Sequence, residues 1–333
     1  MVETNNRLYI NKFEDESFDD YFVRLFENAI DYDLRYYEIA ELLNNECGEQ
    51  YGESKWRKDF KLFKRGMLYE QSKCESGVAT RILSISDLHV PFQKPIEIFN
   101  EYVGKIDILQ INGDLTDFSG ISKFPRAYRS SPMDELIESR QYLIELIEYI
   151  NPKKVVLTYG NHDIRFQTYF VKQLDTDLLE LMPETSLELI CNDGFRHYDK
   201  NLRTKVFYDP LINVFDNIEI EYSNNWYCQI GDVIFCHPLT FKTGIMKTSN
   251  DAVTWFRNEG YNFSALVMAH THRVGEYAVG NTILYEQGAC CETSKMKYSN
   301  GRLVMSQKEG FLYLCLDKDG KPIRESSKLI YLN

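Results

Sequence analysis

Short apolar runs that end abruptly in polar residues are the feature of this chain that most constrains its fold. From Arg81 onward they recur five times, at residues 82–85, 106–111, 155–159, 233–236 and 265–268. Apolar runs of about four to eight residues between polar ones are typical of strands that are buried on both faces, as in parallel sheets. We therefore expect a largely parallel β-sheet in the part of the chain after Arg81.

Helical patterns lie between the first of these runs. Apolar residues recur at helical spacing in two segments: Ile96, Phe99 and Val103, then Leu136, Leu143, Ile147 and Ile150. This alternation predicts βαβ crossovers. Asn300-Gly301 and Asp319-Gly320 separate later strand-like runs and predict hairpins in a second sheet. Two sheets packed face to face with outer helices satisfy these patterns, and residues 165–230 fit either a substrate-facing insertion or a connecting helical layer.

The first 70 residues show a different, helical pattern. Apolar residues recur at spacings of three and four, at Phe22, Leu25, Phe26 and Ile30, and again at Tyr36, Ile39, Ala40 and Leu43. After a break at 44–52, Ser54 offers an N-cap for a further helix with an apolar stripe of Trp56, Phe60 and Phe63. We expect a helical accessory domain at 1–70, a linker at 71–80 and the sheet-containing domain at 81–333.

The helix that follows Ser54 is strongly basic. One acid, Asp59, faces six basic residues: Lys55, Arg57, Lys58, Lys61, Lys64 and Arg65. A helix, a glycine-containing turn and a basic helix form the outline of a helix-turn-helix, whose second helix enters a groove of DNA. Lys55, Arg57, Lys58 and Lys61 would then hold phosphates. A solvated basic face on a helical hairpin explains the same residues, and the sequence leaves both interpretations open.

Composition limits the partners and the location. Because 38 Lys and Arg stand against 50 Asp and Glu, the net charge of −12 excludes a protein whose whole surface wraps nucleic acid, but not a local basic face. No apolar run approaches the roughly 18 residues of a membrane span, and the N-terminus lacks signal-peptide features, so we expect a cytoplasmic protein with no membrane partner. The eight cysteines contain no CxxC pair, which predicts mostly buried, reduced thiols.

Residue types that commonly bind metals stand directly after the predicted strands. Five of the six histidines lie there, together with aspartates and one asparagine: Asp87, His89, Asp114, Asp117, Asn161, His162, Asp163, His237, His270 and His272. Loops at the carboxyl ends of parallel strands converge on one crevice. Imidazole, carboxylate and carboxamide without cysteine suit Mn²⁺, Fe²⁺ or Zn²⁺. The set exceeds the needs of one ion but fits two ions about 3.5–4 Å apart, bridged by a carboxylate, a pair that clamps phosphate for in-line attack.

The order of these motifs resembles the calcineurin-like metallophosphoesterase family. The resemblance covers about residues 80–290 and rests on Ser86-Asp87-Leu88-His89, Asn112-Gly113-Asp114-Leu115-Thr116-Asp117, Gly160-Asn161-His162-Asp163, His237 and His270-Thr271-His272. It implies an α/β fold, a four-layer α/β/β/α sandwich, with a dinuclear site.

The resemblance also assigns a role to each residue of the site. It implies that Asp87, His89 and His272 bind one ion, that Asn161, His237 and His270 bind the other, and that Asp114 bridges them. A bridging water is then the nucleophile, because two cations lower its pKa toward neutrality. His162 matches the histidine that protonates the leaving oxygen, and Asp163 is placed to orient it.

Departures from the family pattern narrow the branch. Ala269 replaces the glycine usual before the last histidine pair, which adds one methyl group and leaves the ligands in place. Phe118 stands where the protein Ser/Thr phosphatase branch has a phosphate-gripping arginine. That branch also has glycine and glutamate where this chain has Val90 and Asp163. The protein phosphatase interpretation is therefore disfavoured.

The remaining motifs are similar to the nuclease branch that includes double-strand-break repair exonucleases, although other phosphodiesterases share them. A DNA-binding role of the N-terminal basic helix would favour a DNA nuclease with two Mn²⁺ ions, or Fe²⁺ or Zn²⁺. Arg165 and Arg273 each stand within three residues of a motif and fit either a contact with a phosphate oxygen or an ordinary surface ion pair. Such nucleases imply a homodimer and a partner ATPase. The acidic remainder of the chain suits a small substrate instead, so a phosphomonoesterase or cyclic-nucleotide phosphodiesterase is the alternative. A non-enzymatic, metal-bound DNA-binding scaffold is the third.

Overall fold

The computed structural model describes residues 10–75, 77–122, 130–296 and 307–332. The chain divides into two compact units, Met1–Ser76 and Gly77–Asn333. Within the described ranges, no helix has both the length and the apolar character needed to cross a membrane. Seven cysteines of the described part are unpaired, and of these only Cys47 is exposed.

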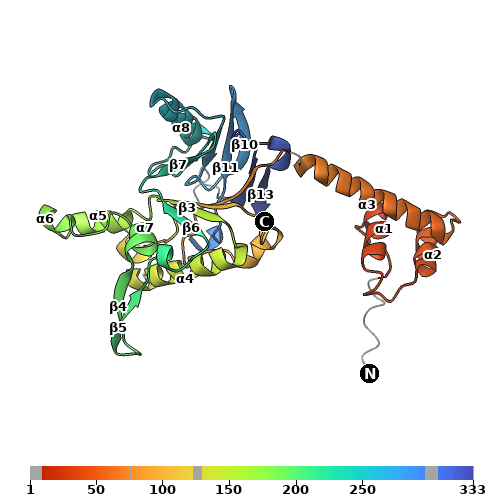
Figure 1. Ribbon diagram of the computed structural model, residues 1–333, viewed down its shortest axis with the longest axis horizontal. Coiled ribbons are helices and arrows are strands. Elements are labelled where there is room, and N and C mark those ends of the chain that lie inside the picture. The colour runs from red at the N-terminus through yellow and green to blue at the C-terminus, as the bar shows by residue number, and fades with distance from the viewer. Residues whose placement is uncertain (1–9, 76, 123–129, 297–306, 333) are drawn as a thin grey trace. The chain divides into compact units, whose positions relative to one another are not determined.

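The first unit consists of three helices around a small core. They are α1 (Phe18–Glu27), α2 (Tyr36–Cys47) and α3 (Glu53–Glu75) (Figure 1). Ser17 caps α1 by accepting a hydrogen bond from the Asp20 N–H, and Gly48 ends α2 in the left-handed conformation. The core side chains come from all three helices: Tyr21, Phe22, Leu25, Phe26, Ile39, Ala40, Leu43 and Trp56.

Three details of this unit differ from the sequence-based expectation. Because α1 ends at Glu27, Ile30 lies beyond the helix and is 93% exposed. Ser54 lies inside α3, which begins at Glu53, so it is not an N-cap. Phe63 is 40% exposed within this unit, because the core of α1 and α2 reaches only as far along α3 as Phe60.

The second unit contains two large sheets. The six-stranded sheet has the order β13-β12-β1-β2-β3-β6, with β1 (Thr80–Ile85), β2 (Ile108–Asn112), β3 (Lys154–Thr158) and β6 (Glu219–Tyr222) parallel and β12 (Glu309–Leu316) antiparallel to both β1 and β13 (Lys328–Leu332). The five-stranded sheet has the order β10-β11-β9-β8-β7. Its strands are β7 (Tyr227–Ile230), β8 (Val233–Cys236), β9 (Ala265–Met268), β10 (Val274–Val279) and β11 (Thr282–Gln287).

Alternating burial along the strands builds the layers. In β8, Val233 and Phe235 face the core between the two sheets, whereas Ile234 and Cys236 face α8 (Lys247–Asn258). On the other side, α4 (Pro132–Ile150) and the 3₁₀ helix η2 (Ile96–Tyr102) cover the six-stranded sheet. Figure 1 shows α4 and α8 on the outer sides of this unit. The predicted four-layer α/β/β/α sandwich is confirmed.

The arrangement also corrects the predicted sheet. The five predicted strands exist but divide between the two sheets, β1 to β3 in one and β8 and β9 in the other. The turn at Asp319-Gly320 leads from β12 toward β13 and therefore extends the first sheet, not the second. The predicted hairpin at Asn300-Gly301 lies outside the described residues. Val103 follows η2 and is 40% exposed, since a 3₁₀ helix does not keep the α-helical period.

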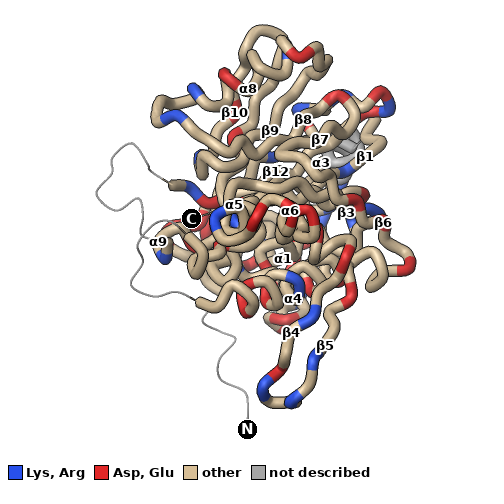
Figure 2. Tube along the Cα trace, turned by 90° about the vertical axis from the view of Figure 1, so that its left-hand side faces the viewer, with Lys and Arg blue, Asp and Glu red and all other residues tan. Residues whose placement is uncertain are grey.

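Residues 165–230, which the sequence left unassigned, hold several short elements. In chain order they are α5 (Arg165–Val171), α6 (Thr176–Leu179), α7 (Ser186–Glu188), η4 (Leu189–Asp193), β4 (Phe195–Asp199), β5 (Thr204–Tyr208) and η5 (Leu211–Asn213), before β6 and β7. β4 and β5 pair only with each other and form a separate antiparallel hairpin. Figures 1 and 2 both show this hairpin extending away from the two large sheets.

Candidate metal centre

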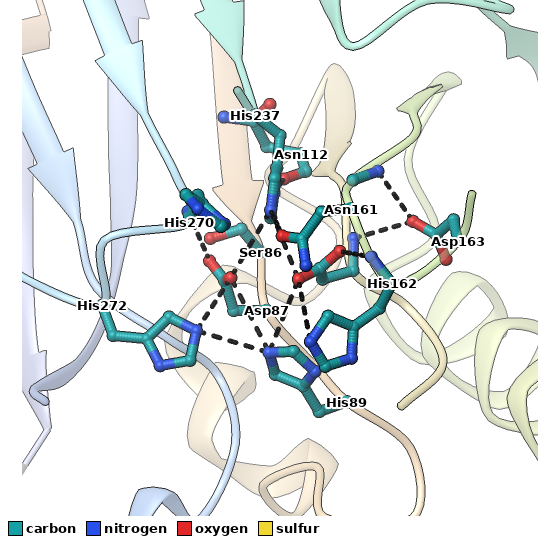
Figure 3. A network of polar contacts seen from close by, with 12 residues as sticks. Ser86, Asp87, His89, Asn112, Asn161, His162, Asp163, His237, His270 and His272 are labelled. Atoms are coloured by element: carbon teal, nitrogen blue, oxygen red, sulfur yellow. Dashed lines mark hydrogen bonds and ion pairs between the residues drawn. The ribbon is translucent and has the colours of Figure 1, made fainter. Parts of the chain in front are cut away.

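The predicted ligands stand on tight turns directly after buried strands. Five of them have positive φ angles, 51° at Asp87, 47° at His89, 53° at Asp114, 71° at His270 and 49° at His272. Each such conformation in a non-glycine residue costs on the order of 1–3 kcal/mol and is concentrated at functional sites. The strained turns bring these side chains together, and Figure 3 shows Asp87, His89, His270 and His272 clustered.

Two glycines make room for this convergence. A Cβ atom on Gly113 would lie 2.5 Å from His237 Nδ1, and one on Gly160 would lie 2.6 Å from the backbone nitrogen of Asp114. Gly113 also has a φ of +78°, which favours glycine on its own account. The loops after β2 and β3 can therefore approach each other and His237 only with glycine at both positions.

The first cluster combines Asp87, His89 and His272, whose ligand atoms all lie within 4.8 Å of one another. His272 Nε2 lies 2.9 Å from Asp87 Oδ1 and 3.3 Å from His89 Nε2. All three side chains are buried. A second set of contacts steadies the cluster, since the amide of Gln307 lies 2.7 Å from His272 Nδ1 and the His270 N–H donates to Asp87 Oδ2.

The second cluster combines Asp114, His237 and His270, again within 4.8 Å. His237 Nε2 lies 3.3 Å from Asp114 Oδ2 and 3.4 Å from Asn161 Oδ1, so the carboxamide belongs to the same cluster (Figure 3). Asp114 Oδ2 is also 3.7 Å from His89 Nε2 of the first cluster. Asp114 therefore lies between the two groups, which is the position that a bridging carboxylate requires.

The donor atoms suit divalent cations. His237 Nδ1 lies 2.8 Å from the carbonyl of Asn112, to which it donates, and this leaves Nε2 as the ring nitrogen that faces Asp114. His270 Nε2 and His89 Nδ1 are buried without a hydrogen-bond partner in the described part of the chain. Buried polar atoms are rarely left unsatisfied in proteins, so an unpaired His270 Nε2 beside two carboxylates is the expected state of a metal-ligand nitrogen.

Electrostatics keep the carboxylates ionised. Burial opposes the charge of Asp87, but the His272 and His237 imidazoles outweigh burial and hold the pKa of Asp87 below its usual range. For Asp114, burial is likewise outweighed by His237 and His162, and its pKa is lowered. Both side chains are therefore negative at neutral pH, as metal ligands must be.

The imidazoles divide into two kinds. Burial and the nearby His237 lower the pKa of His270 to about 3, and burial with His162 lowers the pKa of His89 well below its usual value. Burial also opposes the charge of His237, but the Asp114 and Asp87 carboxylates raise its pKa to about 9. Two imidazoles are thus neutral ligands already, and the third holds a proton that a bound cation would displace.

His162 has a different partner from the one predicted. Its Nδ1 lies 3.0 Å from the carbonyl oxygen of Asp117 and 3.2 Å from Asp117 Oδ1, and its Nε2 lies 2.7 Å from Arg165 Nη2. Arg165 Nη1 also donates to the Asp117 carbonyl, at 2.7 Å. The residue that orients His162 is therefore Asp117, and the prediction that Asp163 does so was wrong.

Asp163 binds backbone instead. Its Oδ2 accepts hydrogen bonds from the N–H groups of Asp114, at 2.8 Å, and Gly160, at 2.9 Å (Figure 3). Burial and the Asp114 charge raise the pKa of Asp163 to about 7. Asp163 therefore joins the loops after β2 and β3, which carry the candidate metal ligands Asp114 and Asn161.

The other predicted substrate-binding residues are spread over the chain. Arg273 donates to the carbonyls of Thr243 and Gly244, so it anchors the loop after His237. Its predicted contact with a phosphate oxygen remains a prediction. The sequence drew no attention to Phe241 on this loop, whose ring centroid lies 5.5 Å from that of His270. No motif marks Phe241, because its place beside His270 depends on two strands that are distant in sequence.

On α3, two of the four predicted basic contacts are already paired. Lys55 forms an ion pair with Asp59 at 2.8 Å, and Arg57 forms one with Glu53 at 3.1 Å. Lys58 and Lys61 are exposed and form no ion pair or hydrogen bond with another residue of the described ranges. The i,i+4 spacing of both ion pairs was visible in the sequence and would have singled out the unpaired lysines.

Each of the two parts of the chain matches a family model. Residues 80–274, more than half of the chain, match the family model of the calcineurin-like phosphoesterases. Residues 6–75 match the model of the YonJ N-terminal domain. The SPbeta prophage-derived uncharacterized protein YonJ of Bacillus subtilis (strain 168) is 36% identical over 66 residues, which are 20% of this chain and 16% of that protein. This chain therefore spans only a small part of that relative.

Solved structures that match part of this chain have low sequence identity and low TM-scores. A novel archaeal phosphodiesterase is 16% identical, with a TM-score of 0.36, over 76% of this chain and 99% of its own. Vacuolar protein sorting 29 of Cryptosporidium parvum is 13% identical, with a TM-score of 0.36, over 77% and 99%. A predicted phosphoesterase of Streptococcus pneumoniae is 14% identical, with a TM-score of 0.27, over 76% and 98%.

Proposed function

The chain belongs to the calcineurin-like phosphoesterase family, and from this premise we propose that it is a dinuclear-metal phosphodiesterase that acts on DNA. The observation that carries the proposal is the place of Asp114. Its Oδ2 lies 3.3 Å from His237 Nε2 of its own cluster and 3.7 Å from His89 Nε2 of the other. A single ion would leave one cluster without use.

We assign the candidate ligands to two ions. Asp87, His89 and His272 would hold one, Asn161, His237 and His270 the other, and Asp114 would contact both. We propose Mn²⁺ for both sites, although Fe²⁺ and Zn²⁺ are equally compatible with the donors. When bound, the two cations would lower the pKa of a water molecule and offset the charge of the phosphate. The donors are carboxylate, imidazole and carboxamide groups without cysteine, a set that suits hard or borderline divalent cations.

His162 is the proton donor in this proposal. Its Nδ1 is held by Asp117, so Nε2 is the nitrogen that delivers the proton to the leaving oxygen. In the structure, however, Nε2 accepts from Arg165, because a guanidinium can only donate. A phosphate oxygen would compete for the same Arg165 donor and leave Nε2 free. Arg165 is thus the phosphate-binding residue that takes the place of the arginine absent at Phe118.

The DNA contact proposed for the first unit rests on α3. Lys58, Lys61 and Arg65 are all exposed, and none has an ion pair or hydrogen bond to another residue that the structure describes. Their spacing of three and four residues places them in one stripe about 10 Å long, opposite the buried face of Trp56 and Phe60. Lys and Arg stripes of this kind bind phosphates without sequence preference.

Hydrolysis of model esters tests the activity first. With Mn²⁺ present, the full chain should cleave bis-p-nitrophenyl phosphate in preference to p-nitrophenyl phosphate, and should then cleave labelled single- or double-stranded DNA. Asp114→Asn serves as the blank. Monoester turnover with intact DNA would support the phosphomonoesterase alternative. Metal binding without hydrolysis of any phosphoester would support the scaffold alternative.

A salt titration tests the α3 stripe. Replacing Lys58, Lys61 and Arg65 by alanine should make the dependence of log K on log salt for duplex DNA less steep by up to about 2.7, at about 0.9 per phosphate contact. The matched control replaces the ion-paired residues Lys55, Arg57 and Lys64, which removes the same charge. If both triple variants changed the salt dependence equally, only net charge would matter, and the proposal that this stripe binds DNA would be wrong.

A further inference from the structure

The β4–β5 hairpin has one face on which basic and aromatic residues alternate. Arg196 pairs with Phe207 across the strands, and Tyr198 pairs with Lys205. Residues two apart on a strand share a face, so these four side chains form one surface. All four are exposed, Tyr198 by 50% and Phe207 by 46%. Two large aromatic rings left this open to solvent on a small hairpin require an explanation.

The opposite face of the hairpin explains its rigidity. Phe195 is buried in the main core of the unit, and its ring stacks on Tyr208, with centroids 5.0 Å apart and planes at 16°. Arg140 of α4 donates to the carbonyl of Asp209, just beyond the end of β5. The hairpin is therefore fixed at its base, while Arg196 and Phe207 on the other side stay exposed in the described part of the chain.

The charge of the hairpin differs from that of the chain. Although the net charge of the protein is −12, residues 195–208 contain four basic residues and one acid. The acid, Asp199, is occupied in the turn, where its Oδ1 accepts from the N–H groups of Asn201 and Leu202. Arg196, Lys200, Arg203 and Lys205 form no ion pair with any residue in the described ranges. Figure 2 shows Lys and Arg grouped at the tip of the hairpin.

We propose that this face, formed by Arg196, Tyr198, Lys205 and Phe207, binds single-stranded nucleic acid. Basic side chains meet the phosphates, and exposed aromatic rings stack on unpaired bases, the combination that binds single strands without sequence preference. The guanidinium of Arg196 lies 5.5 Å from the centre of the Phe207 ring, so it already occupies a stacking geometry. Duplex DNA offers phosphates but no unpaired bases, so two open rings favour the single strand.

The hairpin gives the proposed nuclease a substrate contact inside its catalytic unit, and in that respect the inference rests on the proposed function. Binding is nevertheless measured without turnover. The probe is a fluorescein-labelled thymidine 20-mer, followed by anisotropy with the Asp114→Asn full chain at several salt concentrations. A 20-base-pair duplex is the comparison. Cleavage of bis-p-nitrophenyl phosphate by the unaltered chain reports separately on the metal centre.

Two double variants separate charge from stacking. Arg196→Ser with Lys205→Ser should make the salt dependence of single-strand binding less steep by about 1.4, at about 0.7 per phosphate. Tyr198→Ser with Phe207→Ser should weaken binding by about 5- to 150-fold for each stacked base and leave the salt dependence unchanged. Thermal unfolding and circular dichroism check that each variant is folded.

The matched control is Lys318→Ser with Lys321→Ser, which removes two exposed charges from a turn of the same unit. We expect less than a twofold change in single-strand affinity. Three results would overturn the inference: no binding of the 20-mer, equal losses in the control and the Arg196/Lys205 variant, or tighter binding of the duplex that the aromatic variant does not alter. None of them depends on whether the esterase activity is found.

Discussion

The two units of this protein differ in whether they bury charged residues. In the second unit, Asp87, Asp114 and His237 are buried, and the backbone of neighbouring turns holds them in place. In the first unit, charged residues such as Lys55 and Arg57 lie on the surface and pair with acids one helical turn away. Buried charge is costly and persists only where it is compensated, whereas a solvated ion pair contributes little. In this protein, the buried charged residues, and not the most abundant ones, mark the candidate metal centre.

The largest effect is expected at the bridging carboxylate. Replacing Asp114 by asparagine should lower diester turnover by more than about 10⁴-fold, because both cations, each contributing several kcal/mol, lose a shared ligand. Steady-state kinetics together with metal analysis of the purified variant measure this. Asp319→Asn, an exposed acid in the β12–β13 connection, is the control and should be unchanged. A variant at Asp114 with more than a tenth of normal activity would contradict the two-cluster assignment.

The next effect separates proton transfer from metal binding. His162→Asn should slow turnover about 10²- to 10⁴-fold, the range for a positioned acid, while the metal content stays normal. Asp117→Asn should slow it less and act through the orientation of His162, since Asp117 contacts both His162 and His89. Loss of metal from His162→Asn would show that His162 is a ligand and that its role is assigned wrongly.

A third change tests whether the first unit is energetically separate. Leu43→Ala creates a cavity in the three-helix core, where Leu43 is 0% exposed, and should destabilise that unit by about 2–5 kcal/mol in urea denaturation. Leu62→Ala, at a position 65% exposed on α3, should cost no more than about 0.5 kcal/mol. Hydrolysis of bis-p-nitrophenyl phosphate should be unaffected by either. A parallel loss of esterase activity in Leu43→Ala would remove the contrast between the units.

The smallest effect concerns acid. Burial opposes the charge of Asp107, but hydrogen bonds from Lys153 and from the Arg81 N–H outweigh it, so its pKa is lowered. A lowered folded pKa adds stability above the unfolded pKa of about 3.9, and this stability is lost as pH falls through the folded value. Asp107→Asn should therefore reduce unfolding stability by about 1 kcal/mol or less at pH 7, and by less at pH 3. Equal losses at both pH values would contradict this account.

Sequence reasoning succeeded where residue type and backbone geometry determine each other. A buried strand followed by Asp-x-His or by Gly-Asp can be recognised locally, and β8 and β9 were found at their observed bounds because four apolar residues between polar ones have few alternatives. Two face-to-face sheets with outer helices fitted these runs, and the family resemblance implied the four-layer sandwich. What the sequence could not give was the division of these strands between two sheets, since pairing partners are distant along the chain.

The errors at the site have the same cause. Asp163 was assigned to His162 because they are neighbours in sequence, yet the partner in space is Asp117, on the loop after a different strand. Phe241 and the β4–β5 surface carried no motif, since alternation of basic and aromatic residues on one face appears only when the cross-strand register is known. On α3, by contrast, the surface ion pairs could have been predicted from the i,i+4 spacing alone.

The most direct test of the central claim is a metal titration of this chain after its metal has been removed. Calorimetry with Mn²⁺ would give the number of ions bound per chain, and diesterase activity would be followed in the same series. The account predicts two ions per chain, with hydrolysis of bis-p-nitrophenyl phosphate appearing only as the second is bound and neither bound normally by Asp114→Asn. One ion per chain with full activity would contradict it, because Asp114 would then have no second cation to bridge.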